Sequence, residues 1–250
     1  MMQVAWATDQ GSPERRNEDF VAAALGAVVV LDGCGLPLGT DLGCVHGTAW
    51  YARSLGTRLL ARLTDGLGEA PQAGPPVGPP EGAHRPSRRP LAARLAGAIS
   101  DVAASHRSTC DLRRATTPAA TVLALRVRGD VVDYLVLADS TLLLDGPDIL
   151  QEITGGHVYA AADPAAAEHA ITGTMPRRDL RRAFLLTDGA TRLVDGFGRT
   201  DWPGLIGMID EHGPAGLIGR TRDAERTDPD GARWPRNKIH DDATVVTVTL

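Results

Sequence analysis

The sequence predicts an α+β fold in which antiparallel sheets carry helices on their outer faces. Two observations support this class. The segments come in blocks, namely strands, two helices, strands, two helices and a final strand, which favours segregated layers over alternating β-α units. The first strands, expected at Val4–Thr8, Phe20–Ala24 and Val28–Leu31, are joined by connections too short for a parallel crossover.

Two long helices are expected in the first half of the chain. Apolar residues recur at helical spacing from near Val45 to Leu63, and again from Leu91 to Val102. The Pro/Gly-rich stretch at about 66–90 separates them. We interpret this stretch as a flexible surface loop rather than a domain boundary, because a helix follows at once. The chain is therefore predicted to be one domain over residues 1–250.

The second half is predicted to be richer in strands. The expected elements are the hairpins Ala120–Val127 with Val131–Ala138 and Thr141–Leu144 with Ile149–Ile153, a strand Ala183–Thr187, helices Trp202–Glu211 and Pro214–Arg226, and a last strand Ala243–Thr249. Residues 154–181 give no clear pattern, although Ala161–Thr172 has a helical composition.

Composition and charge exclude several classes of protein. The 43% hydrophobic content is ample for a core. The net charge is −5, and the basic residues are scattered arginines with a single lysine, Lys238, so no nucleic-acid surface is expected. No apolar run is long enough to span a membrane, and residues 1–20 do not resemble a signal peptide. We expect a cytoplasmic protein with no membrane partner.

The cysteines predict a reducing environment and no cysteine-based zinc site. Cys34, Cys44 and Cys110 are odd in number and have no paired spacing, which is typical of reduced thiols. A zinc site built on cysteine is not expected, because no C-x-x-C pair exists. No histidine pair has the H-x-x-x-H spacing of metal ligands.

Acidic residues stand at the ends of several apolar strands. Asp32, Asp139 and Asp188 each follow such a strand, and Asp241 precedes one. A carboxylate at the end of a buried strand is costly unless a charge pairs with it. Divalent cations such as Mn²⁺ and Mg²⁺ prefer carboxylate ligands, so the pattern predicts one shared acidic metal pocket. Cations there would cancel the repulsion and activate a water.

Six short motifs follow one another along the chain. They are Asn17-Glu18-Asp19, Asp32-Gly33, Ala120-Thr121-Val122, Ala138-Asp139-Ser140, Thr187-Asp188-Gly189 and Asp241-Asp242-Ala243-Thr244. In this order they resemble the metal-dependent protein Ser/Thr phosphatase family of type 2C, and in particular a bacterial single-domain member. The resemblance extends from about Thr8 to Thr249 and implies a four-layer αββα sandwich of two antiparallel sheets flanked by helix pairs.

The resemblance also implies two Mn²⁺ or Mg²⁺ ions, with a third, weaker ion in bacterial members. Asp32 would bridge the two ions, while Asp188 and Asp241 would hold one of them. The other implied metal-site residues are Gly33, through its carbonyl, Glu18 and Asp19, through metal-coordinated waters, and Asp139, at the third ion. A water that bridges the ions would be the nucleophile, with Asp32 and Asp188 as catalytic residues.

The sequence departs from the family pattern in three places. The family's phosphate-binding arginine position is Glu14 here, and Arg15 and Arg16 follow it; we predict Arg15 for this role. Cys34 and Leu36 stand where many members have His or Met and Gly. Ala138 replaces a usual glycine, and residues 155–181 match no flap sequence of the family.

These observations predict a metal-dependent phosphomonoester hydrolase. The first hypothesis is a monomeric protein Ser/Thr phosphatase whose substrate is a phosphorylated protein. The departures leave open a catalytically weak or inactive binding or regulatory module of the same fold. The unmatched flap leaves open a phosphatase for a small metabolite.

Overall fold

The computed structural model describes residues 2–65 and 90–250, and the predicted loop at about 66–90 lies outside them except for Pro90. Within these residues the strands form two five-stranded antiparallel sheets, in the orders β1-β10-β9-β6-β7 and β2-β3-β4-β5-β8. The strands are β1 Gln3–Asp9, β2 Phe20–Ala24, β3 Ala27–Leu31, β4 Val122–Arg128, β5 Val131–Leu137, β6 Thr141–Asp145, β7 Leu150–Thr154, β8 Ile171–Pro176, β9 Arg182–Leu186 and β10 Ala243–Thr249.

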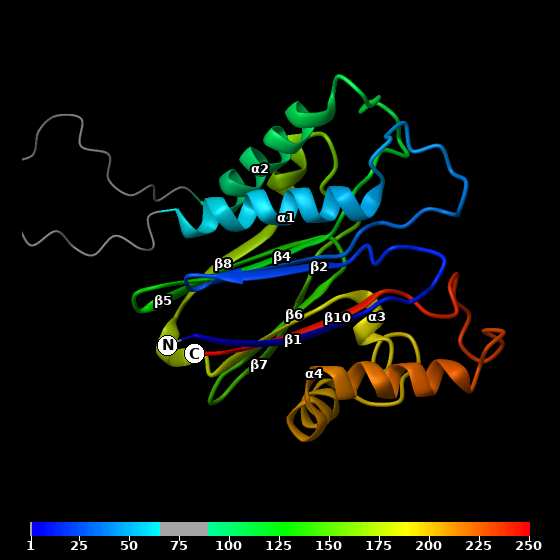
Figure 1. Ribbon diagram of the computed structural model, residues 1–250. Helices are drawn as coiled ribbons and strands as arrows, with labels where there is room; N and C mark the ends of the chain where they lie inside the picture. Colours follow the sequence, from blue (N-terminus) through cyan, green and yellow to red (C-terminus); the bar gives the residue numbers. More distant parts are fainter. Residues whose placement is uncertain (1, 66–89) are drawn as a thin grey trace, which may run out of the picture.

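The two sheets pack face to face and helices cover both outer faces (Figure 1). Helices α1 (Thr48–Thr64) and α2 (Leu91–His106) lie on the sheet that contains β3. Helices α3 (Asp188–Thr191) and α4 (Trp202–Arg226) lie on the sheet that contains β10. The predicted four-layer αββα sandwich is confirmed. Among the described residues, no helix is long and apolar enough to cross a membrane.

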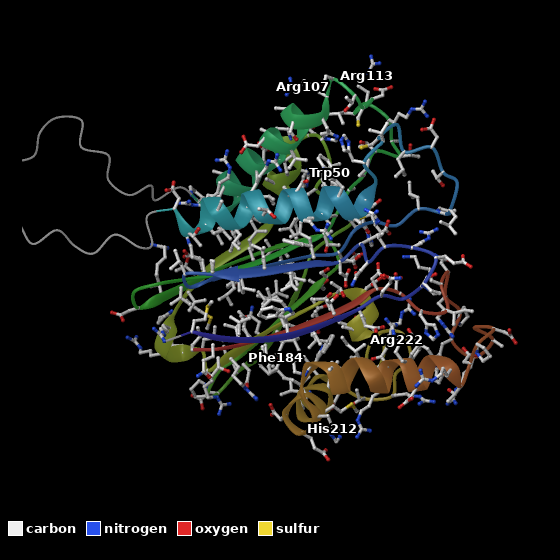
Figure 2. The ribbon with its side chains drawn as sticks, in the orientation of Figure 1. Trp50, Arg107, Arg113, Phe184, His212 and Arg222 are labelled. Atoms are coloured by element: carbon white, nitrogen blue, oxygen red, sulfur yellow. The ribbon has the colours of Figure 1, made fainter. Side chains whose placement is uncertain are left out.

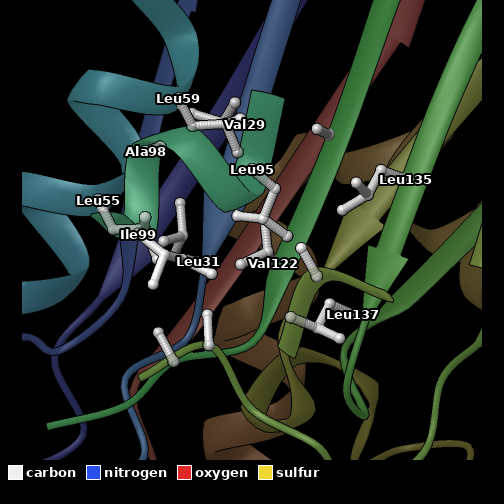
Figure 3. Close-up of a cluster of buried hydrophobic side chains, with 14 of the residues drawn as sticks. Val29, Leu31, Leu55, Leu59, Leu95, Ala98, Ile99, Val122, Leu135 and Leu137 are labelled. Atoms are coloured by element: carbon white, nitrogen blue, oxygen red, sulfur yellow. The ribbon is translucent and has the colours of Figure 1, made fainter. Parts of the chain in front are cut away.

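Strand β3 is fully buried because it has helices on one side and the second sheet on the other. Its side chains alternate between the two faces, as the pleat requires. Val29 and Leu31 join the cluster under α1 and α2 (Figure 3), whereas Val28 and Val30 face the other sheet. A strand buried on both faces appears in the sequence as an unbroken apolar run, and this is why the Val28–Leu31 pattern predicted it well.

Helix α1 packs one stripe of leucines on this strand. Leu55, Leu59 and Leu63 recur at helical spacing and are fully buried. The helix begins at Thr48, so the predicted start near Val45 was wrong. Val45 is 80% exposed and lies in the preceding loop, and its apolar character does not mark a helical face.

Residues 154–181 contain a strand that the sequence did not indicate. β8 pairs with β5 at the edge of its sheet, and most of its side chains are exposed. An exposed edge strand lacks the hydrophobic alternation on which the prediction depends. The helical composition at Ala161–Thr172 corresponds to the short 3-10 helix η1, Pro164–His169, whose side-chain cap is Asp163. The two helices predicted near the C-terminal end are the halves of α4, which bends at Gly213 (φ 71°).

The core between the sheets should dominate stability. We expect Leu123→Ala to lower the free energy of unfolding by about 2–5 kcal/mol, because Leu123 is fully buried between the sheets and its truncation leaves a cavity. Leu150→Ala, on the edge strand β7, should cost under about 1 kcal/mol because Leu150 is 40% exposed. Urea denaturation of both variants checks this, and equal losses would contradict the assignment of the core.

Candidate metal centre

Four of the predicted acidic residues meet at one end of the sandwich. Asp32 follows β3, Asp139 follows β5, Asp188 follows β9, and Asp241 lies before β10. All four line one pocket with a volume of about 500 Å³. Because β9 and β10 are antiparallel neighbours, the end of one strand lies beside the beginning of the other. The fold therefore brings together residues that are far apart in the sequence.

Hydrogen bonds with Thr121, the residue just before β4, position Asp32. The backbone N–H of Asp32 donates to Thr121 Oγ1 at 3.1 Å, and the N–H of Thr121 donates to the Asp32 carbonyl at 2.8 Å. The Thr121 hydroxyl also contacts Ser140 Oγ at 2.6 Å, and both hydroxyls are buried. The predicted Thr121 and Ser140 motifs thus support the backbone of Asp32.

The two Asp-Gly pairs need glycine because other backbone comes close. A Cβ on Gly189 would lie 2.1 Å from the Asp242 carbonyl oxygen, and one on Gly33 would lie 2.9 Å from the Glu18 carbonyl oxygen. Gly33 N–H donates to that Glu18 carbonyl at 3.2 Å. These close approaches pack the acidic loops against each other, and a side chain at either glycine would separate them.

Ala138, which stands where the family usually has glycine, has a backbone conformation that favours glycine. Its φ is 67°, in the left-handed region that favours glycine. The Ala138 carbonyl accepts a hydrogen bond from Gly155 N–H at 2.8 Å. An alanine in this conformation bears a strain on the order of 1–2 kcal/mol.

The Asp241-Asp242 pair divides into two roles. Asp241 lines the pocket, while Asp242 accepts hydrogen bonds from Gly11 N–H at 2.8 Å and Glu18 N–H at 2.7 Å. Asp242 therefore ties the β1–β2 connection to the start of β10. Arg222, which extends from α4 (Figure 2), donates to the Asp241 carbonyl at 2.6 Å and holds the same segment from the other side.

Asp19 and Glu18 do not line this pocket; Asp19 is close enough to raise the pKa of Asp32, and Glu18 lines a neighbouring groove. Asp19 Oδ2 accepts from the Thr187 hydroxyl at 2.9 Å. Asp19 Oδ1 is buried, and no described residue lies in good hydrogen-bonding geometry to it, although the Thr244 hydroxyl is close enough to Asp19 to lower its pKa. A buried carboxylate oxygen without a donor is rare in proteins, and it fits a cation or a cation-bound water at this position. Together with the four pocket carboxylates, it makes a donor set that suits hard divalent cations.

Crowding raises the pKa values of the acidic groups. Burial, reinforced by Asp19, Asp188 and Asp241, holds the pKa of Asp32 well above its usual range. Burial raises the pKa of Asp19 to about 7. Limited hydration in the pocket, with the charge of Asp241, raises the pKa of Asp188 to about 6. The carboxylates thus lack sufficient positive charge from the described residues.

Two basic side chains neutralise part of the negative charge of the carboxylates. The sequence patterns predicted neither of them as a site residue. Lys238 Nζ lies 2.6 Å from Asp241 Oδ1, and Arg192 Nη2 lies 3.2 Å from Asp241 Oδ2. Burial opposes the charge on Lys238, but the bond to Asp241 and the attraction of Glu18 outweigh it and raise the pKa. The available signal was that the chain's single lysine stands just before Asp241.

Arg15 and Arg16 differ in position. Arg15 Nη1 donates to the Leu36 carbonyl at 2.7 Å, beside the loop that starts at Asp32. Arg16 is exposed, and both arginines line a neighbouring groove of about 480 Å³. Arg15 is thus the one whose guanidinium contacts the loop after Asp32. Its role in phosphate binding stays a prediction.

The pocket wall also contains two groups with raised pKa values. Burial and the nearby Asp32 carboxylate raise the pKa of Cys34, so its thiol stays protonated and is a poor nucleophile and metal ligand. Tyr159 donates its hydroxyl hydrogen to Asp139 Oδ2 at 2.9 Å. Burial and that hydrogen bond raise the pKa of Tyr159. Tyr159 belongs to the stretch that no sequence pattern resolved.

Solved structures of bacterial phosphatases are similar to this chain over nearly its full length. The catalytic domain of the serine/threonine phosphatase PstP, with two manganese ions, has a TM-score of 0.62 at 18% identity, covering 99% of this chain and 97% of that one. Stp1 from Staphylococcus aureus has a TM-score of 0.63 at 14% identity, covering 100% and 95%. PppA from Pseudomonas aeruginosa has a TM-score of 0.55 at 16% identity, covering 99% and 97%.

No protein-family model matches the sequence, and no curated protein matches it. The structural likeness establishes the fold: this chain has the αββα fold of the type-2C Ser/Thr phosphatases. The predicted resemblance to that class is confirmed in fold. At 14–18% identity, activity and ligands are matters for the proposal below.

The crowded carboxylates should make the metal-free protein sensitive to pH. The pKa of Asp19 is about 7 in the folded chain, against 3.8 for an ordinary Asp, so the folded form binds the proton more tightly. The resulting stabilisation is complete below about pH 4 and is lost as pH rises through about 7. In EDTA, we expect the melting temperature of the wild type, relative to Asp19→Asn, to fall by a few degrees over that range.

Differential scanning fluorimetry at several pH values measures this difference. Comparing the two proteins removes the contribution of other titrating groups. Mn²⁺ added at about pH 7.5 should raise the melting temperature of the wild type, because a cation stabilises the ionised carboxylates. Parallel melting curves for the two proteins at all pH values would show that Asp19 keeps an ordinary pKa.

Proposed function

We propose that this chain is a metal-dependent phosphomonoester hydrolase that removes phosphate from serine or threonine in proteins. The observation that carries the proposal is the group of four carboxylates around one open pocket, with a buried carboxylate oxygen of Asp19, close to Asp32, that lacks a well-placed donor among the described residues. The shared fold supports the same class of chemistry, and the PstP catalytic domain was solved with two manganese ions.

Each carboxylate has a role in this proposal. Asp32, at the end of β3 and positioned by Thr121, would be a ligand of the cations. Asp188 and Asp241, from the opposite sheet, and the Gly33 carbonyl would be further ligands. Glu18 and Asp19 would orient metal-coordinated waters, and Asp139 would help to hold a third, weaker ion. Bound divalent cations supply charge neutralisation at the phosphoryl group and activate water for attack.

The remaining groups orient the substrate and supply no covalent nucleophile. Arg15 lies beside the loop after Asp32, where a guanidinium can bind phosphate oxygens with two parallel hydrogen bonds. Cys34 stays a neutral thiol in the pocket wall, so no thiolate attack is assigned to it. The pocket opens into solvent and continues near a second groove at Arg15 and Arg16, which suits a phosphorylated segment on a protein surface.

The direct test is hydrolysis of an aryl phosphate with added Mn²⁺. We expect Asp32→Asn and Asp188→Asn to lower kcat/KM by at least about 100-fold, because each removes charge that would hold the cations. The matched control is Asp148→Asn, an exposed aspartate on the β6–β7 turn, which should retain activity. The proposal would be contradicted if EDTA did not reduce wild-type turnover, or if Asp188→Asn retained wild-type turnover. A phosphopeptide panel and a metabolite panel then distinguish the protein phosphatase from the small-metabolite alternative.

One observation favours the second candidate, a binding or regulatory module with little activity. Lys238 Nζ lies 2.6 Å from the predicted ligand Asp241 and, with Glu18, close to Gly35. A fixed ammonium group inside an acidic pocket occupies part of the space and charge that a cation needs. Lys238 would then compete with the metal ion for Asp241, and complete competition would replace the metal ion.

Substituting Lys238 separates the two candidates. We expect Lys238→Met to tighten Mn²⁺ binding by about 10-fold in Kd, or about 1.4 kcal/mol, because a competing cation is removed. Isothermal titration calorimetry measures this, with Arg53→Met on the exposed face of α1 as the charge control. Wild-type protein that binds no Mn²⁺ while Lys238→Met binds it would favour the regulatory module. An unchanged Kd would exclude competition by Lys238.

A further inference from the structure

A second group of metal-ligating side chains lies outside the acidic pocket. Cys44 and His46 belong to the loop before α1, while His106 and Cys110 lie at the end of α2 and just beyond it. Their ligand atoms all lie within 4.8 Å of one another. The expectation that no cysteine-based zinc site exists used only local spacing. The fold brings His106 and Cys110, which are far away in the sequence, next to Cys44 and His46.

The distances are close to those of a tetrahedral site, with the two sulfurs nearer to each other than they would be around a bound ion. Cys44 Sγ lies 3.2 Å from Cys110 Sγ, 3.7 Å from His46 Nδ1 and 3.6 Å from His106 Nδ1, and Cys110 Sγ lies 3.4 Å from His46 Nδ1. In a tetrahedral zinc site with bonds of about 2.3 Å to sulfur and about 2.0 Å to nitrogen, ligand atoms are separated by about 3.3–3.8 Å. The side chains therefore surround a point at which one ion fits.

The two segments are held together independently of the cysteines. Asp111 N–H donates to the Gly43 carbonyl at 2.8 Å, and Arg114 forms an ion pair with Asp41 at 2.8 Å. The Thr116 hydroxyl donates to the Asp41 carbonyl, also at 2.8 Å. These contacts fix the approach of the loop to the end of α2, so the ligands do not depend on a flexible loop for their proximity.

Aromatic packing orients the two imidazoles. Trp50, at the N-terminal end of α1 (Figure 2), stacks on His46 with a centroid distance of 4.2 Å and an interplanar angle of 26°. It also packs on His106 at 5.0 Å. His106 is only 2% exposed. Both imidazoles turn Nδ1 toward the thiols. Groups that orient the ligands from outside are typical of metal sites.

We propose that Cys44, His46, His106 and Cys110 bind one Zn²⁺ ion. Two thiolates with two imidazoles in tetrahedral geometry favour zinc over the hard cations of the acidic pocket. Four protein ligands leave no open position, so the site is structural rather than catalytic. It fastens the loop at 33–47, which begins at the acidic pocket and ends at α1, to the end of α2.

The site also has a consequence for the groove beside the acidic pocket. His46 and Trp50 line this groove together with Arg15 and Arg16. A bound zinc ion would hold one wall of the groove in place. None of the four zinc ligands lines the acidic pocket itself, so the two metal sites are chemically separate.

Cobalt substitution tests the proposal without reference to activity. We expect metal-free full-length protein, titrated with Co²⁺ under reducing conditions, to develop the thiolate-to-cobalt charge-transfer band of a tetrahedral site, and zinc to displace it. Elemental analysis of protein purified from zinc-containing medium should give one equivalent of zinc. Cys110→Ser should abolish the band, and His46→Asn, at an exposed position, should weaken cobalt binding at least 10-fold while circular dichroism stays unchanged.

Two variants provide the controls. Cys34→Ser should keep the band and the zinc, because Cys34 lies in the acidic pocket, and His212→Ala on α4 should keep both. A band that survives Cys110→Ser, or one lost in Cys34→Ser, would overturn the proposal. It would also be overturned by a mass lower by two hydrogens and a Cys44–Cys110 cross-linked peptide in zinc-replete protein, which would identify a disulfide instead.

Discussion

The repulsion among carboxylates at one end of the sandwich is the constraint on which the rest of the site depends. Asp32, Asp188 and Asp241 approach each other from two sheets, and Asp19 lies close to Asp32. The raised pKa values of Asp19, Asp32 and Asp188 show that Lys238 and Arg192 offset this repulsion only in part. A cluster with uncompensated negative charge is unstable unless protons or cations complete it. The destabilising repulsion is therefore concentrated at the residues that would bind the metal ions.

The scaffold makes this crowding possible through rigid, local contacts. Glycines at 33 and 189 allow backbone segments to approach closely, and Asp242 fixes the β1–β2 connection with two backbone hydrogen bonds. The leucine and valine core on both faces of β3 holds the strand whose end presents Asp32. Binding sites held by strand ends are more precise than sites held by free loops. The backbone strain at Ala138 is one local destabilising consequence of that geometry.

The loop at 33–47 connects the two proposed metal centres. Its first residues line the acidic pocket, and its last ones carry Cys44 and His46. A structural ion at the far end would restrict the conformations of a loop whose near end touches Arg15 through the Leu36 carbonyl. Restricting such a loop favours a preorganised site, since less conformational entropy is lost on binding.

The sequence by itself determined the layered fold, most of the strands and the acidic strand ends. These features are local: apolar runs, helical periodicity and Asp-Gly turns show their structure in neighbouring residues. Features without such a pattern were not predicted. Examples are the exposed edge strand β8 and the start of α1 at Thr48. Only the tertiary structure decided that Asp242 binds the β1–β2 connection through Gly11 and Glu18, and that Lys238 lies among the acids. Likewise, only the packing of the loop before α1 against the end of α2 placed Cys44 and His46 beside His106 and Cys110, because proximity between distant segments leaves no spacing to recognise in one sequence.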